Sequence, residues 1–91
     1  MPTAKAPQPK VVIYGNDVCA YCAAARMLFT KKGLLFDDII ISGDDERSEE
    51  MLRLSGSQSV PQIFINDRLI GGFDELCALD KGGDLDRLIG Q

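Results

Sequence analysis

The chain has 91 residues, of which 45% are apolar and 26% are charged. This length suits one small domain with a single core, and the composition is typical of a folded soluble protein rather than a disordered one. Lys and Arg together number 10 against 14 Asp and Glu, so the formal net charge is -4. A chain without a basic excess is not expected to bind nucleic acid or an anionic lipid surface.

Residues 1–9 carry three prolines among small or polar neighbours and lack the apolar centre of a secretory signal. We therefore expect a flexible tail over residues 1–9 and one folded domain over residues 10–91. Elsewhere the apolar runs span only a few residues, far short of the roughly 20 needed to cross a bilayer. The expected location is the cytoplasm, with no membrane contact.

The first half of the chain alternates between strand and helix patterns. Residues 10–14 hold consecutive Val and Ile, which suit a strand covered on both faces. Residues 23–32 are rich in good helix formers and are followed by a glycine stop. A β-branched run at 36–41 follows this crossover, which predicts two parallel strands. Residues 44–54 begin with acidic side chains and end before a glycine, so they predict a second helix.

The second half predicts a hairpin and two helices. Strands at 61–65 and 68–70 flank an Asn-Asp pair, which tolerates the positive φ angles of a tight turn. After a Gly-Gly pair, residues 73–79 have the apolar spacing of a helix, and a second Gly-Gly pair precedes a short amphipathic helix at 84–89. The order predicts an α/β fold with a four-stranded mixed sheet flanked by helices on both faces.

Two thiols, Cys19 and Cys22, stand three positions apart between the first predicted strand and the first predicted helix. Partial positive charge at a helix N-terminus favours thiolate over thiol, so Cys19 is the predicted nucleophile. Cys22, one turn further in and less exposed, is the predicted resolving thiol. Burial as packing residues and a zinc site are the alternatives, but the chain has no His and its third cysteine, Cys77, is distant in sequence.

The element order together with the C-x-x-C is that of the thioredoxin-like fold. Within that fold the chain resembles the glutaredoxins, specifically the small bacterial dithiol type, over about residues 11–88. Three motifs carry the resemblance: Cys19-Ala20-Tyr21-Cys22, Ser59-Val60-Pro61-Gln62-Ile63-Phe64-Ile65 and Ile70-Gly71-Gly72-Phe73-Asp74-Glu75-Leu76. The resemblance implies a monomeric enzyme that uses glutathione to reduce protein-glutathione mixed disulfides and protein disulfides.

The resemblance also implies a glutathione site built from all three motifs. Tyr21 would form a wall of the cleft, and a cis peptide bond between Val60 and Pro61 would turn the Val60 main chain towards the cysteinyl part of glutathione. The glycine turn before the third helix would hold the γ-glutamyl end on free amides. The predicted glutathione-binding residues are Asn16, Tyr21, Gln58, Ser59, Val60, Pro61, Gly72, Phe73 and Asp74.

One departure from the family pattern concerns charge. Asn16 stands where most relatives have a Lys, and like Gln58 it offers only a neutral donor to the glycyl carboxylate of glutathione. We therefore expect a less stabilised Cys19 thiolate and weaker glutathione binding than in relatives with that Lys. Arg26 and Lys31 are the two cations that would compensate.

A second departure is Ala20, which stands where proline is common and leaves the loop freer. Relatives with a small residue here include some that share a [2Fe-2S] cluster between two subunits. Binding of such a cluster by Cys19 and glutathione is therefore the alternative function, and no other metal is expected. A thioredoxin-type reductase is disfavoured because the chain has no Trp. Cys77 is expected to be an inert, buried packing residue.

Overall fold

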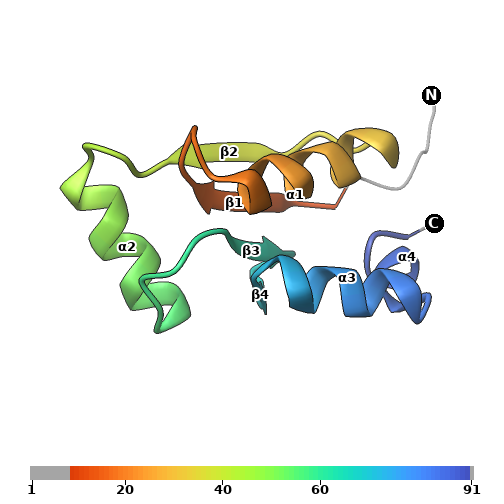
Figure 1. The fold of residues 1–91 in the computed structure, drawn as a ribbon. Helices are drawn as coiled ribbons and strands as arrows, with labels where there is room; N and C mark the ends of the chain where they lie inside the picture. The colour runs from red at the N-terminus through yellow and green to blue at the C-terminus, as the bar shows by residue number, and fades with distance from the viewer. Residues whose placement is uncertain (1–8, 91) are drawn as a thin grey trace, which may run out of the picture.

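The computed structural model describes residues 9–90, and its elements follow the predicted order (Figure 1). The strands are β1 (Val11–Gly15), β2 (Asp37–Ile40), β3 (Gln62–Ile65) and β4 (Arg68–Gly71). The helices are α1 (Ala20–Lys31), α2 (Asp45–Ser55), α3 (Phe73–Lys81) and α4 (Asp84–Leu88). The tail expected at residues 1–9 falls almost wholly outside the described part.

The four strands form one mixed sheet in the order β2-β1-β3-β4. β1 and β2 are parallel, as predicted from the helical crossover, and α1 is the helix that connects them. β1 pairs with β3 and β3 with β4 in antiparallel fashion. Asn66 and Asp67 adopt φ angles of 51° and 66° between β3 and β4, which confirms the predicted tight turn.

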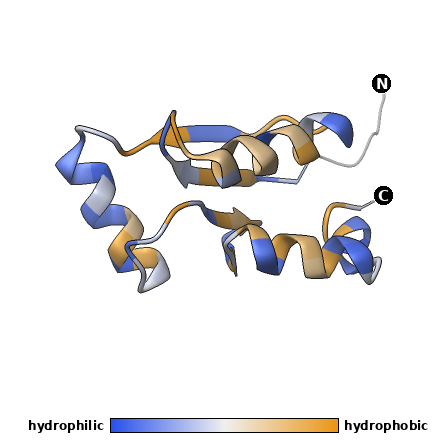
Figure 2. Ribbon diagram, viewed as in Figure 1, coloured by the Kyte–Doolittle hydropathy of each residue, from blue (hydrophilic) through white to orange (hydrophobic). Residues whose placement is uncertain are grey.

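Alternating residues of β1 supply two cores on opposite faces of the sheet. Val11 and Ile13 belong to the larger core, which packs α1, α3 and α4 against one face. Tyr14 belongs to the smaller core, where it meets Met51 of α2 and Phe64 of β3 on the other face. Figure 2 shows that α2 is hydrophilic in its first half and hydrophobic in its second, near the segment that leads into β3. Helices on both faces of the sheet are thereby confirmed.

Polar contacts also hold α2 to the sheet. The phenol of Tyr14 donates a hydrogen bond to a Glu50 carboxylate oxygen, and Arg47 Nη1 lies 3.1 Å from both oxygens of that carboxylate. Burial and this hydrogen bond raise the pKa of Tyr14 to about 12, and the same hydrogen bond lowers the pKa of Glu50. The helix itself begins where the Asp44 side chain accepts from the Arg47 amide at 3.0 Å.

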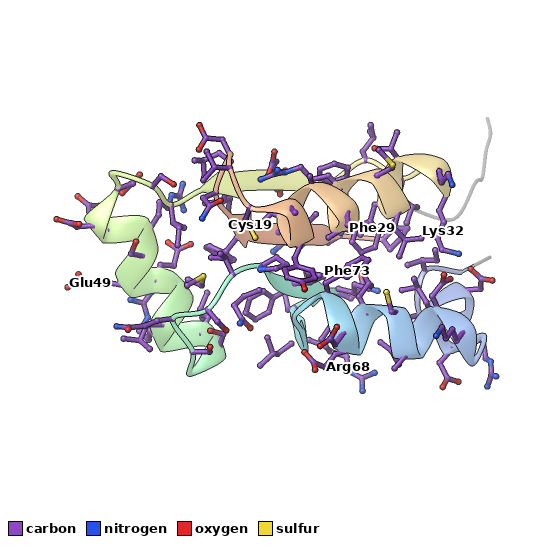
Figure 3. The ribbon with its side chains drawn as sticks, viewed as in Figure 1. Cys19, Phe29, Lys32, Glu49, Arg68 and Phe73 are labelled. Atoms are coloured by element: carbon purple, nitrogen blue, oxygen red, sulfur yellow. The ribbon has the colours of Figure 1, made fainter. Side chains whose placement is uncertain are left out.

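At the other end of the molecule, an ion-pair network joins α1 to α3 and α4. Lys32, directly after α1, lies 2.9 Å from Asp80 Oδ1 and 2.8 Å from Asp86 Oδ1. Figure 3 shows Lys32 on the side of the molecule where α4 lies. This network and the buried Leu85 fix the short last helix, which ends one residue earlier than predicted.

Two further expectations differ from the structure. α1 begins at Ala20 rather than residue 23, because Cys19 is the N-cap with φ -83° and ψ 124°, so the C-x-x-C forms the first helical turn. Cys77 is only half-buried, because α3 directs its neighbour Leu76 into the core and leaves Cys77 beside it at the margin. No helix within residues 9–90 is long and apolar enough to span a membrane.

Candidate active site

The thiol pair lies where β1 passes into α1. β1 ends at Gly15, and the Ala23 amide donates to the Cys19 carbonyl at 3.1 Å, which closes the first turn of α1. Cys19 is half-buried, whereas Cys22 has 0% of its surface exposed. Figure 3 shows Cys19 at the start of α1 and Phe73 at the neighbouring start of α3. An attacking partner can therefore reach Cys19 but not Cys22.

The two thiols differ in acidity. The pKa of Cys19 lies below its usual value, chiefly because the Cys22 amide donates to its sulfur, with further help from the Tyr21 amide and the charge of Arg26. Burial raises the pKa of Cys22 above its usual value. Cys19 therefore loses its proton at a lower pH than Cys22 does.

Asn16 braces the loop that carries the thiols. Its side-chain Oδ1 accepts hydrogen bonds from the amides of Cys19 at 2.7 Å and Val18 at 3.1 Å. Its carbonyl accepts a hydrogen bond of 2.8 Å from Arg26 Nη2. Asn16 does not line the groove described below, so the contacts that the structure shows for it differ from the glutathione contact predicted from the sequence.

Arg26 is the cation that reaches this loop. Its Nε donates to Asp38 Oδ1 at 3.0 Å, so the guanidinium connects β2 to the thiol loop. Lys31, the other candidate, is the exposed last residue of α1, far along the helix from the thiols. Of the two compensating cations considered from the sequence, the structure selects Arg26.

A groove of about 480 Å³ opens beside the thiol loop. It contains most of the predicted glutathione-binding residues, namely Tyr21, Ser59, Val60, Pro61, Gly72, Phe73 and Asp74. Gln58 is exposed between two lining residues but does not itself line the groove. The prediction from sequence missed four lining residues: Ser57, Gln62, Gly71 and Glu75. Gln62, Gly71 and Glu75 lie within the quoted motifs, so the motif positions themselves could have indicated them, whereas Ser57 lies outside the motifs.

One wall of the groove is the segment before β3. The Val60-Pro61 peptide bond is cis, as predicted. Ser57 Oγ accepts from the Ser59 amide at 3.1 Å, and the buried Gln62 donates through Nε2 to the Ser59 carbonyl at 2.9 Å. These side chains satisfy the polar groups of an irregular segment, so its shape is held without regular secondary structure.

The opposite wall is the N-terminus of α3. The first helical hydrogen bond runs from the Leu76 amide to the Gly72 carbonyl at 3.1 Å, so the amides of Phe73, Asp74 and Glu75 have no acceptor within the helix. Glu75 Oε1 accepts from the Gly72 amide at 2.7 Å. A Cβ on Gly71, whose φ is 114°, would lie only 2.8 Å from that oxygen, so this turn requires glycine.

Aromatic and acidic side chains complete the groove. The ring centroids of Tyr21 and Phe73 lie 6.2 Å apart, which joins the two helix N-termini across the site. Asp74 and Glu75 add carboxylates, and the described residues that line the groove include no Lys or Arg. The geometry suits a zwitterion whose carboxylate meets free amides and whose ammonium meets a carboxylate.

In the described part of the chain, metal ligands do not gather around the thiols. Among residues 9–90, no group of three or more His, Cys, Asp or Glu side chains is placed to hold a metal ion. A [2Fe-2S] cluster shared between two subunits would take only Cys19 from each chain. The arrangement within a single chain gives that alternative no support of its own.

A strand-loop-helix thiol pair with one acidic and one buried sulfur, next to a cis-proline segment in a thioredoxin-like fold, defines a thiol-disulfide oxidoreductase. The model of one family within that class, described as Glutaredoxin, matches residues 11–70. The chain belongs to the glutaredoxin family.

Individual relatives agree with this assignment. Glutaredoxin 3 of Escherichia coli strain K12 is 46% identical over 79 residues, which cover 87% of this chain and 95% of the relative. A glutaredoxin of Pseudomonas aeruginosa is 43% identical over 89% of this chain and 96% of its own length. The solution structure of a Brucella melitensis glutaredoxin superposes with a TM-score of 0.80 at 40% identity, covering 94% of both chains. A buckwheat glutaredoxin-glutathione complex superposes with a TM-score of 0.81 at 25% identity, over 88% of this chain and 76% of that one.

Proposed function

We propose that this chain uses glutathione to reduce protein-glutathione mixed disulfides and protein disulfides, through Cys19 and Cys22. The observation that carries the proposal is the groove that Tyr21 lines from between the two thiols, because it offers free α3 amides and acidic side chains close to the C-x-x-C. The buckwheat relative solved with glutathione supports the same ligand class for this groove. A reducing compartment such as the cytoplasm would supply the glutathione, and the chain would act as a monomer.

Each part of glutathione has a proposed contact. The γ-glutamyl carboxylate binds the free amides of Phe73 and Asp74, and the γ-glutamyl ammonium pairs with the Asp74 carboxylate. The cysteinyl part pairs with the Val60 main chain next to Pro61, while Tyr21 and Phe73 flank it.

Among the described residues at the groove, only neutral hydrogen-bond donors are available to bind the glycyl carboxylate of glutathione. Ser59 lies in the groove wall and Gln58 is exposed beside it, whereas Asn16 can offer only its side-chain Nδ2, because its Oδ1 holds the loop amides. A carboxylate that meets no cation is bound less tightly than one that does. We therefore expect glutathione to be held chiefly by its γ-glutamyl end.

For a mixed disulfide, the Cys19 thiolate attacks the glutathione sulfur. A bond forms between Cys19 and glutathione, the original S–S bond breaks, and the target protein leaves as a thiolate that takes up a proton. A second glutathione thiolate then attacks the glutathione sulfur on Cys19. This step releases oxidised glutathione and restores the Cys19 thiolate, so Cys22 is not needed.

For a protein disulfide, Cys19 attacks one target sulfur and forms a mixed disulfide with the target. Cys22 loses its proton and attacks Cys19, which releases the second target thiolate and leaves a Cys19-Cys22 disulfide. Two glutathione molecules then reduce this disulfide in turn and become oxidised glutathione. Glutaredoxin couples of this kind have potentials of about −200 to −230 mV.

An assay that couples glutathione to glutathione reductase tests the proposal. With a small glutathione mixed disulfide as substrate, NADPH consumption should depend on both the chain and glutathione. Chain whose thiols have been alkylated beforehand is the matched control and should give only the background rate. Absence of turnover by the untreated chain would overturn the proposal, as would equal turnover when a flavoprotein thioredoxin reductase replaces the glutathione system.

A further inference from the structure

Arg26 occupies a bridging position between the sheet and the thiol loop. It lies in the middle of α1, and only 20% of its side chain is exposed. One nitrogen of the guanidinium, Nε, binds Asp38 Oδ1 on β2 at 3.0 Å, and another, Nη2, binds the Asn16 carbonyl at 2.8 Å. A planar guanidinium held at both ends in this way has little freedom to move.

The atom that Arg26 holds is connected directly to the reactive cysteine. The same Asn16 whose carbonyl binds Arg26 accepts the Cys19 amide on its side chain at 2.7 Å. A Cβ built on Gly15 would lie 2.6 Å from Cys22 Sγ and 3.7 Å from Arg26 Nη2. The guanidinium and the buried sulfur therefore border the same small space. Arg26 contacts Asn16, which holds the Cys19 amide, and it lies near the Cys22 sulfur.

The other charged groups near the thiols are acidic. Asp17 is exposed on the loop, Asp38 lies on β2, and Asp74 and Glu75 line the groove from α3, whereas Asp37 lies further back on β2, next to Lys10. The Asp38 carboxylate forms an ion pair with Arg26. The charge of Arg26 helps to lower the pKa of Cys19 and opposes the increase in pKa that burial causes at Cys22, so its loss would affect both sulfurs.

We infer that Arg26, anchored by Asp38, is a positioning residue that holds the Asn16 loop in the conformation in which Cys19 is reactive. The inference deepens the proposed reaction and rests on it for the role of Cys19. Arg26 acts through Asn16 and through its charge, and it makes no bond to the reacting sulfur. Asp38 contributes because it fixes the guanidinium, although its own negative charge opposes a nearby thiolate.

The test is the pH dependence of Cys19 alkylation by iodoacetamide, with the modified peptide identified by mass spectrometry. In Arg26→Met the titration midpoint should move to higher pH, and alkylation below the midpoint should slow about three- to tenfold, since one unit of pKa is a tenfold change in thiolate. Arg87→Met removes the same charge from an exposed site on α4 and should leave the midpoint unchanged. Equal shifts in both variants, or no shift in Arg26→Met, would overturn the inference.

The variant Asp38→Ala distinguishes the anchoring of Arg26 by Asp38 from the effect of the Asp38 charge on Cys19. Removing a carboxylate near the thiols would by charge alone make Cys19 more acidic, whereas loss of the anchor should slow alkylation as Arg26→Met does. Asp37→Ala, which removes the neighbouring exposed carboxylate of β2, is the matched control and should change nothing. Faster or unchanged alkylation in Asp38→Ala would contradict anchoring.

Circular dichroism establishes that each variant is folded, and if Arg26→Met is not, Asp38→Ala decides the question alone. Alkylation needs no glutathione, so its outcome is independent of the coupled assay. Lack of turnover with the expected shifts would refute only the proposed function, and turnover without those shifts would refute only the inference.

Discussion

A chain carrying Cys19→Ser should show no turnover of glutathione mixed disulfides above the rate without protein. A serine hydroxyl ionises far less readily than a thiol, and no other described cysteine combines exposure with donation from helix amides. Cys22 is fully buried, and Cys77 lies on α3 outside the groove lining. The coupled glutathione assay measures this loss.

Cys77→Ser is the matched control for that loss, because it removes one thiol from a half-buried position and should keep the full rate. Retained activity in Cys19→Ser would show that another sulfur performs the attack. Loss of activity in Cys77→Ser, with the fold intact, would give the third cysteine a role that its position does not explain.

The variant Cys22→Ser should retain the reduction of glutathione mixed disulfides and lose the reduction of protein disulfides. Turnover of small glutathione mixed disulfides should continue, because attack and regeneration both use Cys19 and external glutathione. Reduction of a peptide with an internal disulfide should fall to the background rate, because only the sulfur one helical turn away is placed to attack the Cys19-target bond.

The mutant should also accumulate a covalent complex with the disulfide peptide, visible on a gel without reductant. The native chain treated in parallel should show little of this complex. If Cys22→Ser reduced the internal disulfide at the native rate, glutathione alone would be resolving the complex and Cys22 would have no part in it.

Most of the fold could be predicted from local patterns. The buried Val and Ile of β1, the glycine after α1 and the Asn-Asp turn each act over a few neighbouring residues, so the sequence alone indicates them. Most of the groove could be predicted too, because all of its lining residues except Ser57 come from the three sequence motifs. The resemblance, rather than periodicity, supplied their roles.

The side-chain contacts within the loop could not be predicted in the same way. The sequence predicts Asn16 as a ligand donor, and this stays a prediction; what the sequence does not indicate is that its side-chain oxygen binds the loop and its carbonyl binds Arg26. Whether an Asn side chain turns inwards to backbone amides or outwards to a ligand depends on local backbone geometry, which spacing does not reveal. Cys77 was misplaced for a related reason, since helical spacing does not fix which residue at the edge of an apolar face stays partly exposed.

The choice between Arg26 and Lys31 likewise needed the tertiary structure. Both are cations on α1, and the sequence treats them alike. The packing of α1 on the sheet brings Arg26 beside Asp38, 12 residues away in the chain, while Lys31 is exposed at the helix end. A contact between a helix and a strand of this kind depends on how the two elements are oriented.

The central claim is that Cys19 attacks the glutathione sulfur of a mixed disulfide. The most direct test incubates the Cys22→Ser variant with a glutathionylated peptide, without free glutathione, and determines where the glutathione is bound afterwards. Mass spectrometry of the intact chain and its peptides should find glutathione on Cys19 and the peptide released as a free thiol, because the proposed contacts place the glutathione half of the substrate in the groove. Peptide attached to Cys19 with glutathione released, or glutathione found on Cys77 instead, would contradict the claim.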